Sequence, residues 1–173
     1  MAQKTLIDVN NLGIKGTSVR GISFDVREKE IVSILGRSGS GKTLVLLAMA
    51  GMIEHDGKII ISRRVDPKEF IGHGFFEKAD EPNEDETVSD YLFLTENMRS
   101  DDMRRFRDMT AMEKALVSLK KADREVMILD EPTKNLTREE RRIFWNSIPE
   151  GRTIIFSTKD EEEARLAKVI VRL

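Results

Sequence analysis

The chain has 173 residues, of which 39% are hydrophobic and 35% are charged, and its formal net charge is −2. This length suits one globular domain with a hydrophobic core, and the nearly neutral balance favours neither a nucleic acid nor an anionic membrane as an electrostatic partner. The absence of cysteine excludes disulfides, thiolate metal sites and cysteine catalysis, and it suits a reducing cytoplasm.

Neither a signal peptide nor a membrane span is expected. The first ten residues are polar and include Lys4 and Asp8, unlike a secretion signal. The longest apolar run, residues 44–53, is too short to cross a bilayer. We therefore expect a cytoplasmic protein, and any work at a membrane would need a partner that supplies the spanning segments.

Runs typical of strands alternate with runs typical of helices along the chain. The expected strands are 5–9, 22–26, 31–35, 58–62, 70–73, 125–129, 153–157 and 168–172, and the expected helices are 42–51, 88–98, 101–108, 111–121 and 161–167. This order predicts an α/β fold in which helices flank a largely parallel sheet. We expect residues 1–173 to form a single domain.

The middle of the chain differs in composition. Residues 77–90 carry seven carboxylates against one lysine, Lys78, which predicts a solvated, mobile loop. Helix-type runs follow it, and the last of them begins with Thr110 and Glu113 in a capping-box pattern. Residues 77–121 are therefore expected to form a small helical lobe.

A phosphate-binding loop follows the apolar run 31–35. Its pattern is G-x-x-x-x-G-K-T, formed by Gly36, Arg37, Ser38, Gly39, Ser40, Gly41, Lys42 and Thr43. Glycines let the backbone fold tightly enough for successive N–H groups to hold the β- and γ-phosphates of a nucleotide. Lys42 adds a positive charge, and the Thr43 hydroxyl is a ligand for the accompanying Mg²⁺. We therefore expect the chain to bind a nucleoside triphosphate with Mg²⁺.

A second motif, Asp130-Glu131-Pro132-Thr133, ends the apolar run 126–129. Open α/β sheets bind ligands at the carboxyl ends of their strands. Asp130 is expected there to hold the Mg²⁺ shell, and Glu131 to orient or deprotonate an attacking water. The pairing of both motifs is a stronger signal for a nucleotide site than either alone.

The order and flanks of these motifs resemble an ATP-binding cassette (ABC) ATPase over essentially the whole chain. Residues 24–32 resemble the family's entry to the phosphate loop, 125–133 its Walker B strand, and 154–167 its switch region. The resemblance implies a P-loop NTPase fold of ABC type, with an N-terminal antiparallel β piece and a reduced helical lobe. It also implies ATP and Mg²⁺ as cofactors, a second ATPase subunit, identical or different, and a transmembrane permease as a possible partner.

Several positions depart from the family pattern. The switch histidine is replaced by Lys159, either a surface lysine left by loss of function or a lysine that contacts phosphate. Residues 109–113 stand in place of the Leu-Ser-Gly-Gly-Gln signature, so Thr110 and Glu113 form either a plain helix cap or a degenerate signature. Ala111 and Met112 would crowd a phosphate where the family has glycines.

Three further departures affect the nucleotide site. Thr137 replaces the aspartate that follows the Walker B strand, and the expected glutamine falls near Phe76 or Glu77. Before the loop, the sequence offers no aromatic residue placed to stack on adenine, which predicts a loose choice of base.

The resulting hypothesis is a divergent ABC ATPase subunit that binds Mg-ATP, hydrolyses it slowly and energises a membrane transporter through a partner. Glu131 and Lys159 are the candidate catalytic residues, and Thr43 and Asp130 are the candidate metal ligands. Two alternatives remain: a nucleotide-binding pseudo-ATPase with a regulatory or assembly role, and an ABC ATPase in a non-transport complex.

Overall fold

The computed structural model describes residues 4–62, 67–76 and 78–173. In chain order its elements are β1 (Thr5–Gly13), β2 (Ile22–Arg27), β3 (Ile31–Leu35), α1 (Lys42–Met49), β4 (Asp56–Ile61), α2 (Pro67–Phe70), β5 (Ile71–His73), α3 (Val88–Glu96), the 3-10 turn η1 (Phe106–Asp108), α4 (Ala111–Ala122), β6 (Val126–Leu129), α5 (Arg138–Asn146), β7 (Thr153–Thr158), α6 (Glu161–Ala164) and β8 (Val169–Arg172).

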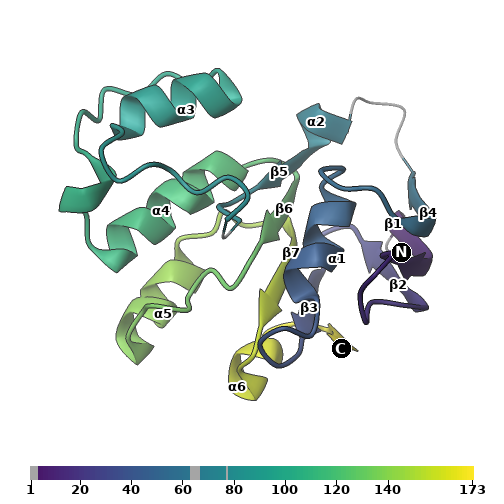
Figure 1. Ribbon diagram of the computed structural model, residues 1–173. Helices are drawn as coiled ribbons and strands as arrows, with labels where there is room; N and C mark the ends of the chain where they lie inside the picture. The colour runs from purple at the N-terminus through teal and green to yellow at the C-terminus, as the bar shows by residue number, and fades with distance from the viewer. Residues whose placement is uncertain (1–3, 63–66, 77) are drawn as a thin grey trace.

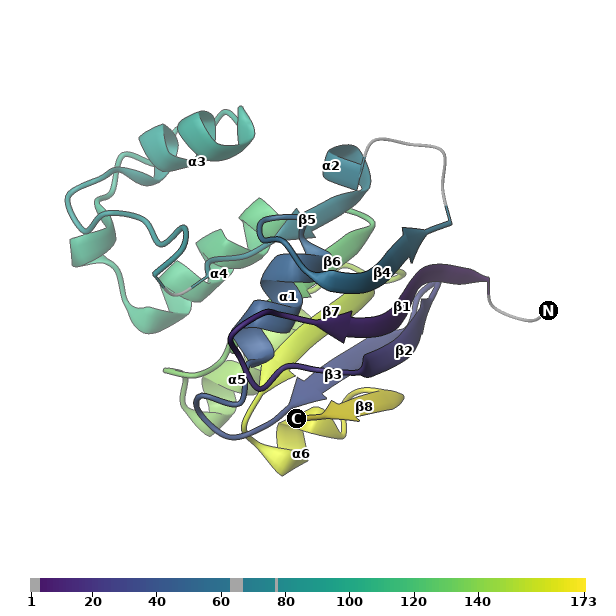
Figure 2. The same cartoon turned by 45° about the vertical axis from the view of Figure 1, so that its right-hand side comes forward.

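The strands form two sheets with helix α1 between them (Figures 1 and 2). One sheet is parallel, with the strand order β5-β6-β7-β3-β8, and the other is antiparallel, with the order β2-β1-β4. The predicted fold class is therefore confirmed, including the N-terminal antiparallel piece.

The central strands β6 and β7 are buried along their whole length, as their continuous apolar runs predict. Alternate residues of β6 face opposite layers of the molecule. Val126 and Ile128 join the core beneath α1, whereas Met127 and Leu129 pack with residues of α4 and α5. Burial on both faces fixes the carboxyl end of β6, where the acidic motif begins.

The helical lobe, here α3, η1 and α4, lies on the opposite side of the molecule from the antiparallel sheet (Figure 1). It has a small core of its own, in which Tyr91 and Phe106 pack edge to face with 5.5 Å between ring centroids. Such aromatic contacts add to the stability that burial provides.

The predicted helix over 101–108 is wrong, because only Phe106–Asp108 forms a helical turn. The Arg104 backbone N–H donates to Asp102 Oδ1 at 3.1 Å, and the Val88 N–H donates to the Arg104 carbonyl at 3.0 Å. These local and longer-range hydrogen bonds compete with the helical pattern. The segment therefore runs alongside the start of α3.

A few other boundaries differ from the sequence-based expectation. Strand β1 continues to Gly13, four residues beyond the predicted end, and α6 stops at Ala164. Phe70, expected to begin a strand, instead ends the short helix α2.

The acidic segment contacts basic side chains of the lobe. Asp80 pairs with Lys121 at 2.8 Å, Glu84 pairs with Lys114 at 2.8 Å, and Asp85 pairs with Arg107 at 2.5 Å. Residue 77 lies outside the described residues. These ion pairs attach the rest of the segment to the lobe at several points, and its mobility stays a prediction.

Candidate nucleotide-binding site

The phosphate loop connects β3 to α1 and requires glycine at two positions. Gly39 and Gly41 have φ angles of 80° and 98°, in the left-handed region that glycine adopts without steric cost. A Cβ atom on Gly41 would lie 2.3 Å from Cγ2 of Val19, so a larger residue would displace that buried side chain. The loop therefore has the tight backbone that the motif predicts.

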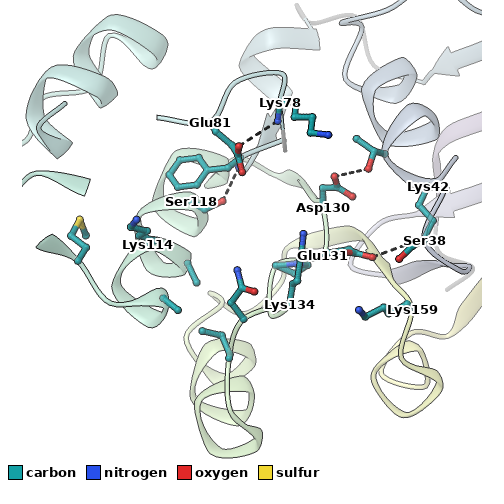
Figure 3. A pocket seen from close by; sticks show the side chains of 18 of the residues that line it. Ser38, Lys42, Lys78, Glu81, Lys114, Ser118, Asp130, Glu131, Lys134 and Lys159 are labelled. Carbon is teal, nitrogen blue, oxygen red and sulfur yellow. Dashed lines mark hydrogen bonds and ion pairs between the residues drawn. The ribbon is translucent and has the colours of Figure 1, made fainter. Parts of the chain in front are cut away.

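The four principal site residues come together where β3 and β6 end, and Figure 3 shows three of them, Lys42, Asp130 and Glu131. Lys42 Nζ lies 3.2 Å from Glu131 Oε1, although the lysine is only 5% exposed. The Thr43 hydroxyl donates a hydrogen bond to Asp130 Oδ2 at 2.8 Å. A charged amine, a hydroxyl and two carboxylates therefore share one small volume.

Burial raises the pKa of the Asp130 carboxyl above its ordinary value, while hydrogen bonds from Ser157 and Thr43 act in the opposite direction. A divalent cation beside this carboxyl would favour its charged form. A cation bound beside Asp130 would therefore stabilise the charged carboxylate against the effect of burial.

A cleft of about 860 Å³ opens in front of these residues. Its walls include Ser38, Gly39, Lys42, Thr43, Asp130, Glu131 and Lys159 on the sheet side, and Phe75, Lys78, Met109, Ala111, Lys114 and Ser118 toward the helical lobe. Figure 3 shows Lys42 and Lys159 across the cleft from Lys114 and Ser118. This volume is in the range of small-molecule and cofactor sites.

The predicted residues do not all meet at this cleft. Gly36 to Thr43 form the loop and the first turn of α1, Asp130 and Glu131 follow β6, and Lys159 is an exposed residue directly after β7. Thr110 and Glu113 are not among the residues that line the cleft. They cap the N-terminus of α4 instead.

A match to a family model shows to which protein family the chain belongs. The model of the ABC transporter family matches residues 19–134, two thirds of the chain. This protein belongs to the ABC transporter family. With its phosphate loop and acidic strand, it is a nucleotide-binding cassette of that family.

Curated relatives resemble the cassette along most of its length. The energy-coupling factor transporter ATP-binding protein of Methanosphaera stadtmanae is 26% identical over 201 residues, which cover 90% of this chain and 71% of that protein. The galactose/methyl galactoside import ATP-binding protein of Treponema pallidum is 27% identical over 175 residues, which cover 81% and 35%. The cassette spans between 8% and 35% of the length of the first three curated relatives that it matches.

Solved structures share the fold of the cassette. A dimeric bacterial ABC transporter cassette superposes with a TM-score of 0.72 and 17% identity, covering 97% of this chain and 94% of the other. A putative cobalt transport ATP-binding protein gives a TM-score of 0.70 and 24% identity, covering 91% and 71%. None of the helices that the structure describes is long and apolar enough to cross a membrane.

Thr110 and Glu113, which stand in place of the family's signature, form a hydrogen-bonded cap at the start of helix α4. Thr110 Oγ1 accepts from the Glu113 N–H at 3.2 Å, and the Thr110 N–H donates to Glu113 Oε2 at 2.8 Å. Hydrogen bonding from Thr110 holds the pKa of Glu113 below its ordinary value, so this carboxylate stays charged. Because a negative charge already occupies the start of α4, a phosphate would meet repulsion there.

Phe76 and Glu77 are the two positions near which the sequence placed the missing glutamine. Phe76 is fully buried, and its ring centroid lies 5.1 Å from that of His73. Glu77 lies outside the described residues. The Phe76 side chain therefore belongs to the core and has no polar atom that could contact a nucleotide.

The sequence did not predict a role for Ser157, which contacts both Asp130 and Glu131. Its hydroxyl donates to Asp130 Oδ1 at 2.5 Å and accepts from the Glu131 N–H at 2.9 Å. The available signal was a polar residue at the carboxyl end of the apolar run 154–156, next to the strand that carries Asp130.

Proposed function

We propose that this cassette binds Mg-ATP at its phosphate loop, hydrolyses it slowly and energises a membrane transporter through a partner chain. The convergence of Lys42, Thr43, Asp130 and Glu131 at one edge of the parallel sheet carries the proposal. The family, and the relatives named as transporter ATP-binding proteins, support the same function.

The residues present fit a Mg²⁺ ion that arrives with ATP. Thr43 Oγ1 and Asp130 Oδ2 are 2.8 Å apart, and both are hard oxygen donors of the type Mg²⁺ prefers. Bound there, the ion would neutralise charge on the phosphate oxygens. Lys42, buried beside Glu131, would exchange its carboxylate partner for phosphate.

Slow hydrolysis is proposed because the half-site formed by Lys42, Thr43, Asp130 and Glu131 is intact, whereas other positions that the family uses for turnover are altered. Phe76 has no hydrogen-bonding side chain, Lys159 replaces the histidine of the family, and Glu113 places a carboxylate at the start of α4. Loss of one well-placed transition-state contact commonly lowers a rate by about 10²–10³. The cassette therefore retains the residues for nucleotide binding more completely than the residues that the family uses for ATP hydrolysis.

We further propose that the cassette works in the cytoplasm with a second ATPase subunit, and at a membrane through a permease. In this cassette the carboxylate of Glu113 occupies the position at which the family's signature would contact phosphate. A different chain whose signature lacks such a carboxylate would therefore complete a site better than a second copy. A pseudo-ATPase with a regulatory or assembly role is the alternative that these alterations favour, and a non-transport ABC ATPase is a second alternative. A membrane-protein gene beside this gene would support the transport role.

The binding proposal predicts that Lys42→Ala weakens ATP binding by about 10- to 100-fold, the effect expected for a lost hydrogen bond between charged groups. Titration with a fluorescent ATP analogue measures the affinity. Lys114→Ala is the matched control, since Lys114 lines the same cleft from the opposite wall and pairs with Glu84. Equal affinity in the wild type and Lys42→Ala would refute binding at this loop.

Lys159 is exposed at the rim of the cleft, and its two possible roles predict different results. We expect Lys159→Ala to leave ATP affinity and turnover within about twofold of the wild type, as is usual for an exposed charge. Steady-state phosphate release and analogue titration measure both. A fall of about tenfold in turnover would instead identify a lysine that contacts the transferred phosphoryl group.

A further inference from the structure

Ser157 is a buried hydroxyl that joins the two carboxylate residues of the site. Its relative exposure is 0%, and it lies one position beyond the Leu129–Phe156 pair of the β6–β7 ladder, beside Asp130. A serine hydroxyl has one proton to donate and lone pairs to accept. Ser157 donates to Asp130 Oδ1 and accepts from the Glu131 N–H, so both hydrogen bonds pass through one oxygen.

The hydrogen bond to Asp130 determines which carboxylate oxygen faces the phosphate loop. Asp130 Oδ1 is engaged by Ser157, and Oδ2 accepts from the Thr43 hydroxyl. Without Ser157, the Thr43 hydroxyl alone of these two partners would hold the carboxylate, and Oδ1 would be buried without this donor. A ligand carboxylate held in place by its own hydrogen-bond partner binds metal more tightly.

The hydrogen bond to Glu131 supports an uncommon backbone conformation. Glu131 has a φ angle of 40°, in the left-handed region, which is sterically unfavourable for a residue with a side chain. The Glu131 N–H has a defined acceptor in this conformation because Ser157 lies directly opposite it. The direction of the Glu131 side chain toward Lys42 therefore depends on Ser157.

We propose that Ser157 is a positioning residue of the nucleotide site, which orients Asp130 toward Mg²⁺ and holds Glu131 in its left-handed conformation. The inference rests on the proposed binding of Mg-ATP. Ser157 itself touches neither nucleotide nor metal in this scheme. Ser157 should therefore affect the gain in ATP affinity that Mg²⁺ provides, and not the affinity measured without Mg²⁺.

Ser33 provides a matched control. It is also 0% exposed, lies on the neighbouring strand β3 and donates its hydroxyl to the Ala164 carbonyl at 3.1 Å. Replacement of either serine by alanine removes one buried hydroxyl from the same sheet. The described hydrogen bonds of Ser33 do not include Asp130 or Glu131, so only Ser157→Ala disconnects the acidic motif.

The experiment compares the affinity of a fluorescent ATP analogue in Mg²⁺ and in EDTA for the wild type, Ser157→Ala, Ser157→Thr and Ser33→Ala. We expect Ser157→Ala to reduce the Mg²⁺-dependent gain in affinity by about tenfold or more, as for other residues that support a metal ligand. Its affinity in EDTA should stay within about twofold of the wild type, because the phosphate loop is unchanged. Ser157→Thr, which keeps the hydroxyl, and Ser33→Ala should retain the gain.

Other outcomes would overturn the inference. A Mg²⁺-dependent gain within about twofold of the wild type in Ser157→Ala, or an equal loss in Ser33→Ala, would show that the hydroxyl has no positioning role. An equal fall in affinity with and without Mg²⁺ would show a general structural defect, which the melting temperatures of the two alanine variants would also reveal. If the wild type itself binds no analogue in either condition, the proposed function fails and the inference fails with it.

Discussion

Replacement of Lys121 by methionine is expected to lower the free energy of unfolding by about 3 kcal/mol, the lower end of the cost of breaking a buried ion pair. Lys121 is 1% exposed, and its Nζ lies 2.8 Å from Asp80 Oδ2, 3.0 Å from His73 Nδ1 and 3.5 Å from Glu96 Oε1. Methionine fills a similar volume but leaves two carboxylates without this cation. Because Asp80 and Glu96 keep some contact with water, the lower figure applies. Urea unfolding followed by circular dichroism measures the loss.

Lys120→Met is the control, since Lys120 lies next to Lys121 on α4 and is exposed. The same chemical change should there alter stability by no more than about 0.5 kcal/mol. Equal losses in the two variants would assign the effect to helix propensity. A loss below about 1 kcal/mol for Lys121→Met would contradict a structural role for the buried ion pair.

The Lys121 contacts show what the sequence could not predict about the helical lobe. They join the end of β5 at His73, the acidic segment at Asp80 and helix α3 at Glu96. The acidic composition of 77–90 predicted a solvated, mobile loop, and its ion pairs with the lobe were not foreseen because the partners depend on how α3 and α4 pack. The error over 101–108 has a similar origin, because the hydrogen bond from Val88 to Arg104 links residues far apart in sequence.

The parallel sheet and the half-site were predictable because their signals are local. Continuous apolar runs identify strands buried on both faces, and the motif spacing places Lys42, Thr43, Asp130 and Glu131 after β3 and β6. Ser157 could not be assigned in the same way. Its contact with Asp130 depends on the register of β6 with β7, in which Leu129 pairs with Phe156.

Replacement of Glu131 by glutamine is expected to lower ATP turnover by about 10²–10³, while ATP affinity stays equal or increases. Glutamine has nearly the same shape but cannot accept the proton of an attacking water. It also removes a negative charge 3.2 Å from Lys42, where the phosphates are expected to bind, so repulsion decreases. Phosphate release under saturating Mg-ATP measures turnover, and analogue titration measures affinity.

Glu81→Gln is the matched control for this change, because Glu81 is an exposed carboxylate that lines the same cleft. Its turnover should stay within about twofold of the wild type. If wild-type turnover is no faster than that of Glu131→Gln although both proteins bind ATP, Glu131 is not the base. The cassette would then be a nucleotide-binding pseudo-ATPase. Retention of ATP binding in that result would still support the roles proposed for Lys42, Thr43 and Asp130, since these act on the bound nucleotide before any bond is broken.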